Sequence, residues 1–217
     1  MAVLKACIFD LDGVIVDTAK YHFLAWQRLA EALGITFTKE DNERLKGISR
    51  MASLNIILDI GGVTLRDEEK VALLEKKNTW YLALIKDMDE SEILPGVEDL
   101  LHELRDNNIG IALGSSSKNA KRILRLISLE EYFETIVDGT VITNAKPDPE
   151  VFLTGAKNLN QKPEDCVVFE DAEAGIQAAI NADMKSIGCG EEASLGAANF
   201  VVQSLEAVNV NRIKSLF

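Results

Sequence analysis

Short apolar runs alternate along the chain with stretches of helical periodicity. The runs are rich in Val and Ile and are bounded by Gly, Asp or Ser, which is typical of parallel strands covered on both faces. They lie at Val3–Phe9, Ile109–Leu113, Thr135–Val137, Cys166–Phe169 and Ser186–Cys189. Helices are expected between them at Val97–Asn107, Asn119–Ile127, Pro149–Asn158 and Glu173–Ala182. The alternation predicts an α/β fold built on a doubly wound parallel sheet.

This alternation is interrupted between residues 17 and 90, where no strand is predicted. Amphipathic helices are expected at Ala19–Leu33, which ends before Gly34, and at Asp67–Lys86. A helical cap domain inserted after the first strand explains the order: residues 1–16 and 91–217 would form the core domain, and residues 17–90 the cap domain. The two crossings between them would act as a hinge for a cleft at the carboxyl ends of the strands.

Composition and charge narrow the class of partner. Hydrophobic residues make up 47% and charged residues 27% of the chain, as in ordinary folded proteins. The formal net charge of −12 would repel nucleic acid and anionic lipid surfaces, so neither is an expected partner. A small anionic substrate would need local Lys, Arg or metal to overcome this charge.

The three cysteines indicate the redox environment in which the protein works. Cys7, Cys166 and Cys189 lie in or beside short apolar runs and show no zinc-site spacing, so we expect buried free thiols in a reducing environment. No apolar run is long enough to span a bilayer. The sequence therefore predicts a cytoplasmic protein without a membrane partner.

Two carboxylates follow the first predicted strand directly. Asp10 and Asp12 are two residues apart, so they point to the same side of an extended chain, and Gly13 permits a tight exit. An Asp-rich turn is the usual meaning of such a pair. Here the position after a buried strand favours a site, and the repulsion between the carboxylates favours Mg²⁺.

Polar side chains also follow three later strand or loop ends. Gly114–Asn119 is rich in Ser and opens a helix, which suits either a phosphate cradle or a simple helix cap. Lys146 precedes Pro147, a pair that is usually a surface turn but that can project a cation into the cleft. Glu170 and Asp171 are adjacent acids at a strand end, where metal binding would offset their repulsion.

In this order the four motifs resemble those of the haloacid dehalogenase superfamily over nearly the whole chain. The resemblance implies a Rossmann-like core and Mg²⁺-dependent phosphoryl transfer. It implies that Asp10 is the nucleophile and that Asp12 is the general acid and base. Ser115 and the amide of Ser116 would hold the transferring phosphoryl group, and Lys146 would neutralise its charge. The implied metal ligands are the Asp10 carboxylate, the Asp12 backbone carbonyl, Glu170 and Asp171.

The cap contains one informative stretch, Leu45–Arg50, in which a Gly turn is flanked by cations. From the residues alone, a solvated helix end is the favoured interpretation. The stretch nevertheless resembles the cap motif of the β-phosphoglucomutases within the superfamily. This resemblance implies a binding set in three parts. The parts are Arg50, Ser117 and Asn119 at a second phosphate, Lys46, Gly47, Lys77 and Asn78 near the hexose, and Thr18 and His22 at the hinge.

The reaction implied is the interconversion of β-D-glucose 1-phosphate and glucose 6-phosphate, with Mg²⁺ as cofactor and β-glucose 1,6-bisphosphate as intermediate and primer. The partner would be a small sugar phosphate, and we expect a monomer. Two alternatives stay open: a sugar-phosphate phosphatase with the same core, and a non-catalytic sugar-phosphate-binding regulator. Ser116, where mutases often carry Ala, favours the phosphatase. Ala172, where many relatives carry Ser or Thr, removes a hydrogen bond near the metal position.

Overall fold

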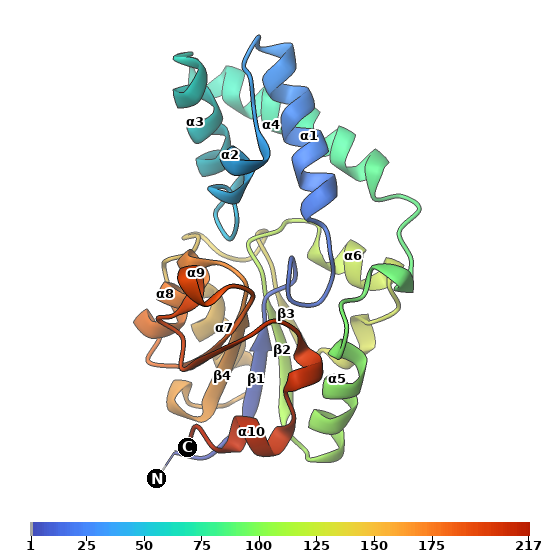
Figure 1. The fold of residues 1–217 in the computed structure, drawn as a ribbon, viewed down its shortest axis with the longest axis vertical. Coiled ribbons are helices and arrows are strands. Elements are labelled where there is room, and N and C mark those ends of the chain that lie inside the picture. Colours follow the sequence, from blue (N-terminus) through green and yellow to red (C-terminus); the bar gives the residue numbers. More distant parts are fainter. Residues whose placement is uncertain (1) are drawn as a thin grey trace.

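A computed structural model describes residues 2–217 and contains one parallel sheet covered by helices on both faces (Figure 1). The strand order is β3-β2-β1-β4-β5-β6, and every pairing is parallel. The strands are β1 (Ala6–Phe9), β2 (Gly110–Gly114), β3 (Thr135–Val137), β4 (Cys166–Glu170), β5 (Lys185–Cys189) and β6 (Phe200–Val202). The predicted doubly wound α/β fold is confirmed.

The central strand β1 shows how the two faces are built. Its residues are all buried and alternate in direction, as a strand requires. Cys7 and Phe9 belong to the apolar cluster under α5, α6 and α10, and Ala6 and Ile8 belong to the cluster under α7 and α8. The helices of the core are α5 (Val97–Asp106), α6 (Ala120–Leu126), α7 (Glu150–Asn158), α8 (Glu173–Asn181), α9 (Glu192–Leu195) and α10 (Val210–Lys214).

Four helices follow β1 and lie beyond one end of the sheet, at the top of Figure 1. They are α1 (Ala19–Ala32), α2 (Lys39–Glu43), α3 (Arg50–Gly61) and α4 (Asp67–Leu84). They bury an apolar cluster of their own that includes Trp26, Leu54 and Ile57. This arrangement matches a helical cap placed after the first strand.

The segments that lead into and out of the cap run side by side. Val16 and Ile93 form an isolated antiparallel bridge. The Leu94 amide donates to the Ile15 carbonyl at 3.0 Å, and the Asp17 amide donates to the Glu92 carbonyl at 3.1 Å. The cap is therefore attached through two adjacent crossings, as a hinge requires.

Several elements differ from the prediction. The first strand begins at Ala6, because Val3 is half exposed and its amide is held by the Asp165 side chain instead of by the sheet. Helices α2 and α3 and strand β6 were not predicted. Within the described residues, no helix combines the length and apolar character that a membrane crossing needs.

Candidate active site

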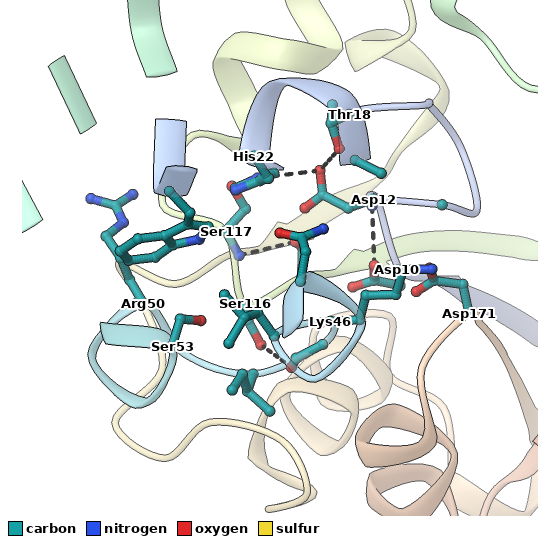
Figure 2. Close-up of a pocket in the computed structure, with 18 of the residues that line it drawn as sticks. Asp10, Asp12, Thr18, His22, Lys46, Arg50, Ser53, Ser116, Ser117 and Asp171 are labelled. Carbon is teal, nitrogen blue, oxygen red and sulfur yellow. Dashed lines mark hydrogen bonds and ion pairs between the residues drawn. The ribbon is translucent and has the colours of Figure 1, made fainter. Parts of the chain in front are cut away.

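A cavity of about 820 Å³, partly open to solvent, lies between the cap and the carboxyl ends of the strands (Figure 2). Twelve of the sixteen predicted site residues line it: Asp10, Asp12, Thr18, His22, Lys46, Gly47, Arg50, Lys77, Ser115, Ser116, Ser117 and Asp171. The other four are Lys146 and Glu170, which are buried at the cavity floor, and Asn78 and Asn119, which bond to each other beside it.

Asp10 is the first residue after β1, and the sheet fixes its backbone. Its amide donates to the Phe169 carbonyl of β4 at 2.9 Å. One carboxylate oxygen lies 2.5 Å from Lys146 Nζ, and the other accepts the Asp12 amide at 3.1 Å. The Asp10 carboxylate is therefore oriented by a cation and a backbone donor.

Lys146 is fully enclosed and contacts two carboxylates, those of Asp10 and Glu170. Burial alone would lower the pKa of Lys146, but the two carboxylates outweigh it and raise the pKa above its ordinary value. The loop before α7 is held by Glu150, whose carboxylate accepts the Thr143 amide at 2.9 Å and the Asn144 amide at 2.6 Å. The lysine is thus a fixed positive charge beneath the cavity.

Asp12 is surrounded by groups from the start of α1. The buried Thr18 hydroxyl donates to its carboxylate, and His22 Nε2 lies 3.9 Å from the same oxygen. Burial and the nearby Asp10 charge raise the pKa of Asp12 to about 6, even though Thr18 and Lys146 act in the opposite direction. Near neutral pH this carboxyl can either hold or accept a proton.

His22 and Lys77 join α1 to α4 along one wall of the cavity. Lys77 Nζ lies 3.0 Å from His22 Nδ1 and 4.3 Å from the centre of the Trp26 ring. Burial, and then the charge of Arg50, lower the pKa of Lys77 to about 7. The same burial and the charges of Lys77 and Arg50 hold the pKa of His22 well below its ordinary value. His22 is therefore neutral, and its Nδ1 shares a hydrogen bond with Lys77 Nζ.

Asp171 lies against the loop that follows β1. A side chain at Gly13, whose φ is +81°, would come within 2.2 Å of the Asp171 carboxylate, so only glycine permits this approach. Burial and the charges of Glu170 and Asp10 raise the pKa of Asp171 well above its ordinary value. The excess of negative charge suits a divalent cation.

The predicted metal ligands are not gathered as a set of three. Among residues 2–217, no three His, Cys, Asp or Glu side chains are grouped closely enough to hold a metal ion. Glu170, one of the predicted ligands, has protein partners: its carboxylate contacts Lys146 and accepts the Ala172 amide. Asp10, Asp171 and the Asp12 carbonyl still fit Mg²⁺, which commonly takes one or two carboxylates together with substrate phosphate.

The Ser-rich segment after β2 places three hydroxyls at the cavity. Ser115 is buried and its hydroxyl accepts the Ser117 amide at 3.1 Å. The Ser116 hydroxyl donates to the Gly47 carbonyl of the cap at 3.2 Å (Figure 2). Beside the cavity, Asn119 Nδ2 donates to Asn78 Oδ1 at 3.0 Å. This segment therefore contacts the cap and shares the cavity with the nucleophile.

The cap supplies two further cations to the cavity. Arg50 begins α3 and forms no ion pair with any carboxylate of the described chain, and burial lowers its pKa. Lys46 forms an ion pair with Glu43 at 2.7 Å, in which both side chains are partly exposed. Arg50 is thus an uncompensated positive charge on the side of the cavity opposite the carboxylates (Figure 2).

Some lining residues were missed from the sequence, among them Trp26, Asn42 and Ser53. Ser53 lies three residues after Arg50 and shares its face of α3, and Trp26 lies four residues after His22 on α1. Helical spacing from a predicted site residue is the signal that could have found both. For Ser53 it required predicting α3 first.

The family model, the sequence relatives and the solved structures that match this chain each cover most of its length. A family model described as haloacid dehalogenase-like hydrolase matches residues 4–183. β-Phosphoglucomutase of Bacillus subtilis is 48% identical over 202 residues, which are 92% of this chain and 89% of that protein. A phosphatase of phosphorylated carbohydrates from Thermotoga maritima is 34% identical and covers 85% of this chain and 84% of its own. The crystal structure of β-phosphoglucomutase from Clostridium difficile matches with a TM-score of 0.94 and 45% identity over 98% of this chain and 96% of that one. The chain therefore belongs to the haloacid dehalogenase-like hydrolase family.

Proposed function

We propose that this chain is a Mg²⁺-dependent phosphotransferase that interconverts β-D-glucose 1-phosphate and glucose 6-phosphate. One observation carries the proposal: a single cavity has the Asp10 and Asp12 carboxylates on its core side and the unpaired Arg50 on its cap side. A substrate with a phosphate at each end, such as β-glucose 1,6-bisphosphate, would engage both sides at once. The two β-phosphoglucomutases matched at 48% and 45% identity support this substrate class.

Asp10 would act as the nucleophile. One carboxylate oxygen attacks phosphorus, the bond from phosphorus to the sugar oxygen breaks, and an aspartyl phosphate forms. Lys146 lies beside the attacked position and offsets the negative charge of the phosphoryl oxygens. The Ser115 hydroxyl and the Ser116 amide, at the end of β2, would hold the remaining oxygens.

Asp12 would move the proton. In the first step it protonates the sugar oxygen that leaves, and in the second it removes the proton of the hydroxyl that attacks the aspartyl phosphate. A pKa of about 6 suits both tasks near neutral pH. Thr18 and His22 hold the Asp12 carboxylate at the hinge and would couple its position to cap closure.

Mg²⁺ dependence is characteristic of the family. The Asp10 and Asp171 carboxylates and the Asp12 carbonyl would hold the ion, and Glu170 would support Lys146. When bound, the ion would neutralise charge that builds up on the transferring phosphoryl group.

The cap residues would bind the rest of the substrate. Arg50 offers a planar pair of donors for the non-transferring phosphate. Ser117 and Asn119 would assist it from the core. The hexose hydroxyls would lie near the remaining cap residues of the predicted set, which are Lys46, Gly47, Lys77 and Asn78.

A sugar-phosphate phosphatase is the second candidate, favoured by the 34% identical Thermotoga maritima phosphatase. It would use the same core, with water in place of the sugar hydroxyl. A non-catalytic regulator is disfavoured, because Asp10, Asp12 and Lys146 are all present and in contact.

One assay separates mutase from phosphatase. Glucose 6-phosphate and free phosphate are measured in parallel from β-glucose 1-phosphate, with Mg²⁺ and a trace of β-glucose 1,6-bisphosphate. The proposal predicts that glucose 6-phosphate is the dominant product and that its formation depends on the primer. Free phosphate as the dominant product would establish the phosphatase, and no turnover of either kind would favour the regulator.

A further inference from the structure

Ser116 belongs to the core but its hydroxyl bonds to the cap. It follows β2 by two residues, and its oxygen donates to the Gly47 carbonyl, 69 positions earlier in the chain, at 3.2 Å. Its hydroxyl is therefore engaged with the cap, while its backbone amide has no hydrogen-bond partner within the described part of the chain. These two groups of one residue would then have separate tasks.

The Gly47 turn is held on its other side by Ala172. A side chain at Gly47 would come within 2.7 Å of the Ala172 methyl group, and the φ of Gly47 is +70°. The turn thus lies between two core loops, one after β2 and one after β4. A second bond from cap to core, between Asn78 and Asn119, lies beside the cavity. These contacts need no substrate, because each joins one part of the chain to another.

We propose that Ser116 is a positioning residue that fastens the closed cap to the core through the Gly47 carbonyl. The proposal rests on the mutase function proposed above. The bond favours the closed form before sugar phosphate binds, so less of the substrate's binding energy is spent on closure. Closure also limits the access of water to the aspartyl phosphate, which favours transfer to sugar over hydrolysis.

The test is Ser116→Ala, which removes the hydroxyl and keeps the amide. We expect the KM for β-glucose 1-phosphate to rise about two- to tenfold, the range for one neutral hydrogen bond. The kcat should stay within about twofold, since saturating substrate restores closure, and the ratio of free phosphate to glucose 6-phosphate should rise. Ser215→Ala is the matched control, because it removes a hydroxyl-to-carbonyl bond at the C-terminal end of α10, a helix that lies far from the cap (Figure 1).

A second variant keeps the outcome decisive. Gly47→Ala should displace the turn and so break the bond from Ser116 to the Gly47 carbonyl. The double variant with Ser116→Ala should therefore have a KM within about twofold of that of Gly47→Ala alone. Three outcomes would each overturn the proposal. The first is that the effects of the two substitutions on KM multiply in the double variant. The others are that Ser116→Ala lowers kcat with KM unchanged, or that it changes neither constant. If wild type releases only phosphate, the mutase function fails. The KM values for hydrolysis of wild type, the two single variants and the double variant then still decide whether Ser116 fastens the cap.

Discussion

The nucleophile position shows how single residues create the site. Asp10 is buried, and its carboxylate contacts Lys146 on one side and the Asp12 amide on the other. A buried carboxylate without such partners would be costly. The same two contacts that make the charge tolerable also fix the orientation of the carboxylate at the cavity.

Asp10→Asn is therefore expected to abolish turnover and leave the fold intact. The amide has the same shape but cannot form the acyl phosphate, so the rate should fall by at least about 10³-fold, as for other nucleophile deletions. Turnover of β-glucose 1-phosphate and the thermal unfolding curve are measured side by side. A folded variant that keeps a tenth of the wild-type rate would exclude covalent catalysis by Asp10.

The lowered pKa of Lys77 predicts that the free energy of unfolding depends on pH. Burial lowers its pKa to about 7 in the folded chain, below the ordinary value of 10.5. The unfolded chain then binds more protons between these values, so the free energy of unfolding should rise as pH increases from 7 to about 10. The slope from this group is at most about 1.4 kcal/mol per pH unit. Below pH 7 the destabilisation is fully present.

Urea unfolding of wild type and Lys77→Met at several pH values measures this contribution. The Met variant lacks the titrating group, so the difference in unfolding free energy between the two proteins should change across the window. Lys76→Met, one position earlier and exposed to solvent, is the matched control. Parallel curves for Lys77→Met and wild type would mean that Lys77 titrates normally.

At the scale of elements, α3 places its N-terminus at the cavity. Ser49 caps the helix by accepting the Ala52 amide at 3.2 Å, and Arg50 is the first helical residue. The positive end of the helix dipole and the guanidinium therefore act together on an anion. No other element of the cap contributes an unpaired arginine to this cavity among the described residues.

Arg50→Ala should slow the mutase reaction, which needs a second phosphate, more than the hydrolysis of a donor that has only one. Loss of charge-assisted hydrogen bonds worth about 1.5–3 kcal/mol should lower kcat/KM for the mutase reaction by about 10- to 150-fold. Hydrolysis of acetyl phosphate, which has no second phosphate, should change far less. Arg50→Lys should recover part of the loss, since it keeps the charge without the planar fork. Equal loss of both activities would make Arg50 a structural residue and favour the phosphatase.

The elements that sequence reasoning found and missed differ in physical character. Strands β1, β2 and β4 are buried on both faces, so their apolar runs stand out, and the polar residues at their ends mark the site. Helix α3 was missed because its apolar residues are spread around the helix and give no clear face. Strand β6, which has three residues at the edge of the sheet, was also missed.

The contacts between distant residues could not be predicted in the same way. That Asp12 and Arg50 share one cavity followed only from a resemblance to a family. The position of Glu170 against Lys146 depends on side-chain directions that spacing does not give. Such pairings are set by packing across the sheet, which a single sequence does not encode locally.

At the scale of the whole molecule, the site gathers carboxylates whose negative charge is not fully neutralised by cations of the fold. Asp171 is half-buried, and burial and the charges of Glu170 and Asp10 raise its pKa. A carboxylate in that position destabilises the folded chain at neutral pH until a cation binds. Function and stability are therefore opposed at this residue.

Asp171→Asn should raise the melting temperature in metal-free buffer, because it removes one repelling charge. Wild type should gain stability on addition of Mg²⁺, since ligands of the folded state stabilise it, and the variant should gain much less. Thermal unfolding with chelator and with increasing Mg²⁺ tests both statements. An equal Mg²⁺ response in the two proteins would remove Asp171 from the metal site.

The central place of β1 in the sheet has a consequence for synthesis of the chain. Its two neighbours are β2 and β4, which begin at residues 110 and 166, whereas the apolar cluster of the cap extends only from Phe23 to Trp80. On the ribosome the cap can therefore fold while the first strand, already made, has no partner. The apolar segment Ala6–Phe9 stays unprotected until residues 110–114 and then 166–170 emerge, and this interval is when the nascent chain most needs a chaperone.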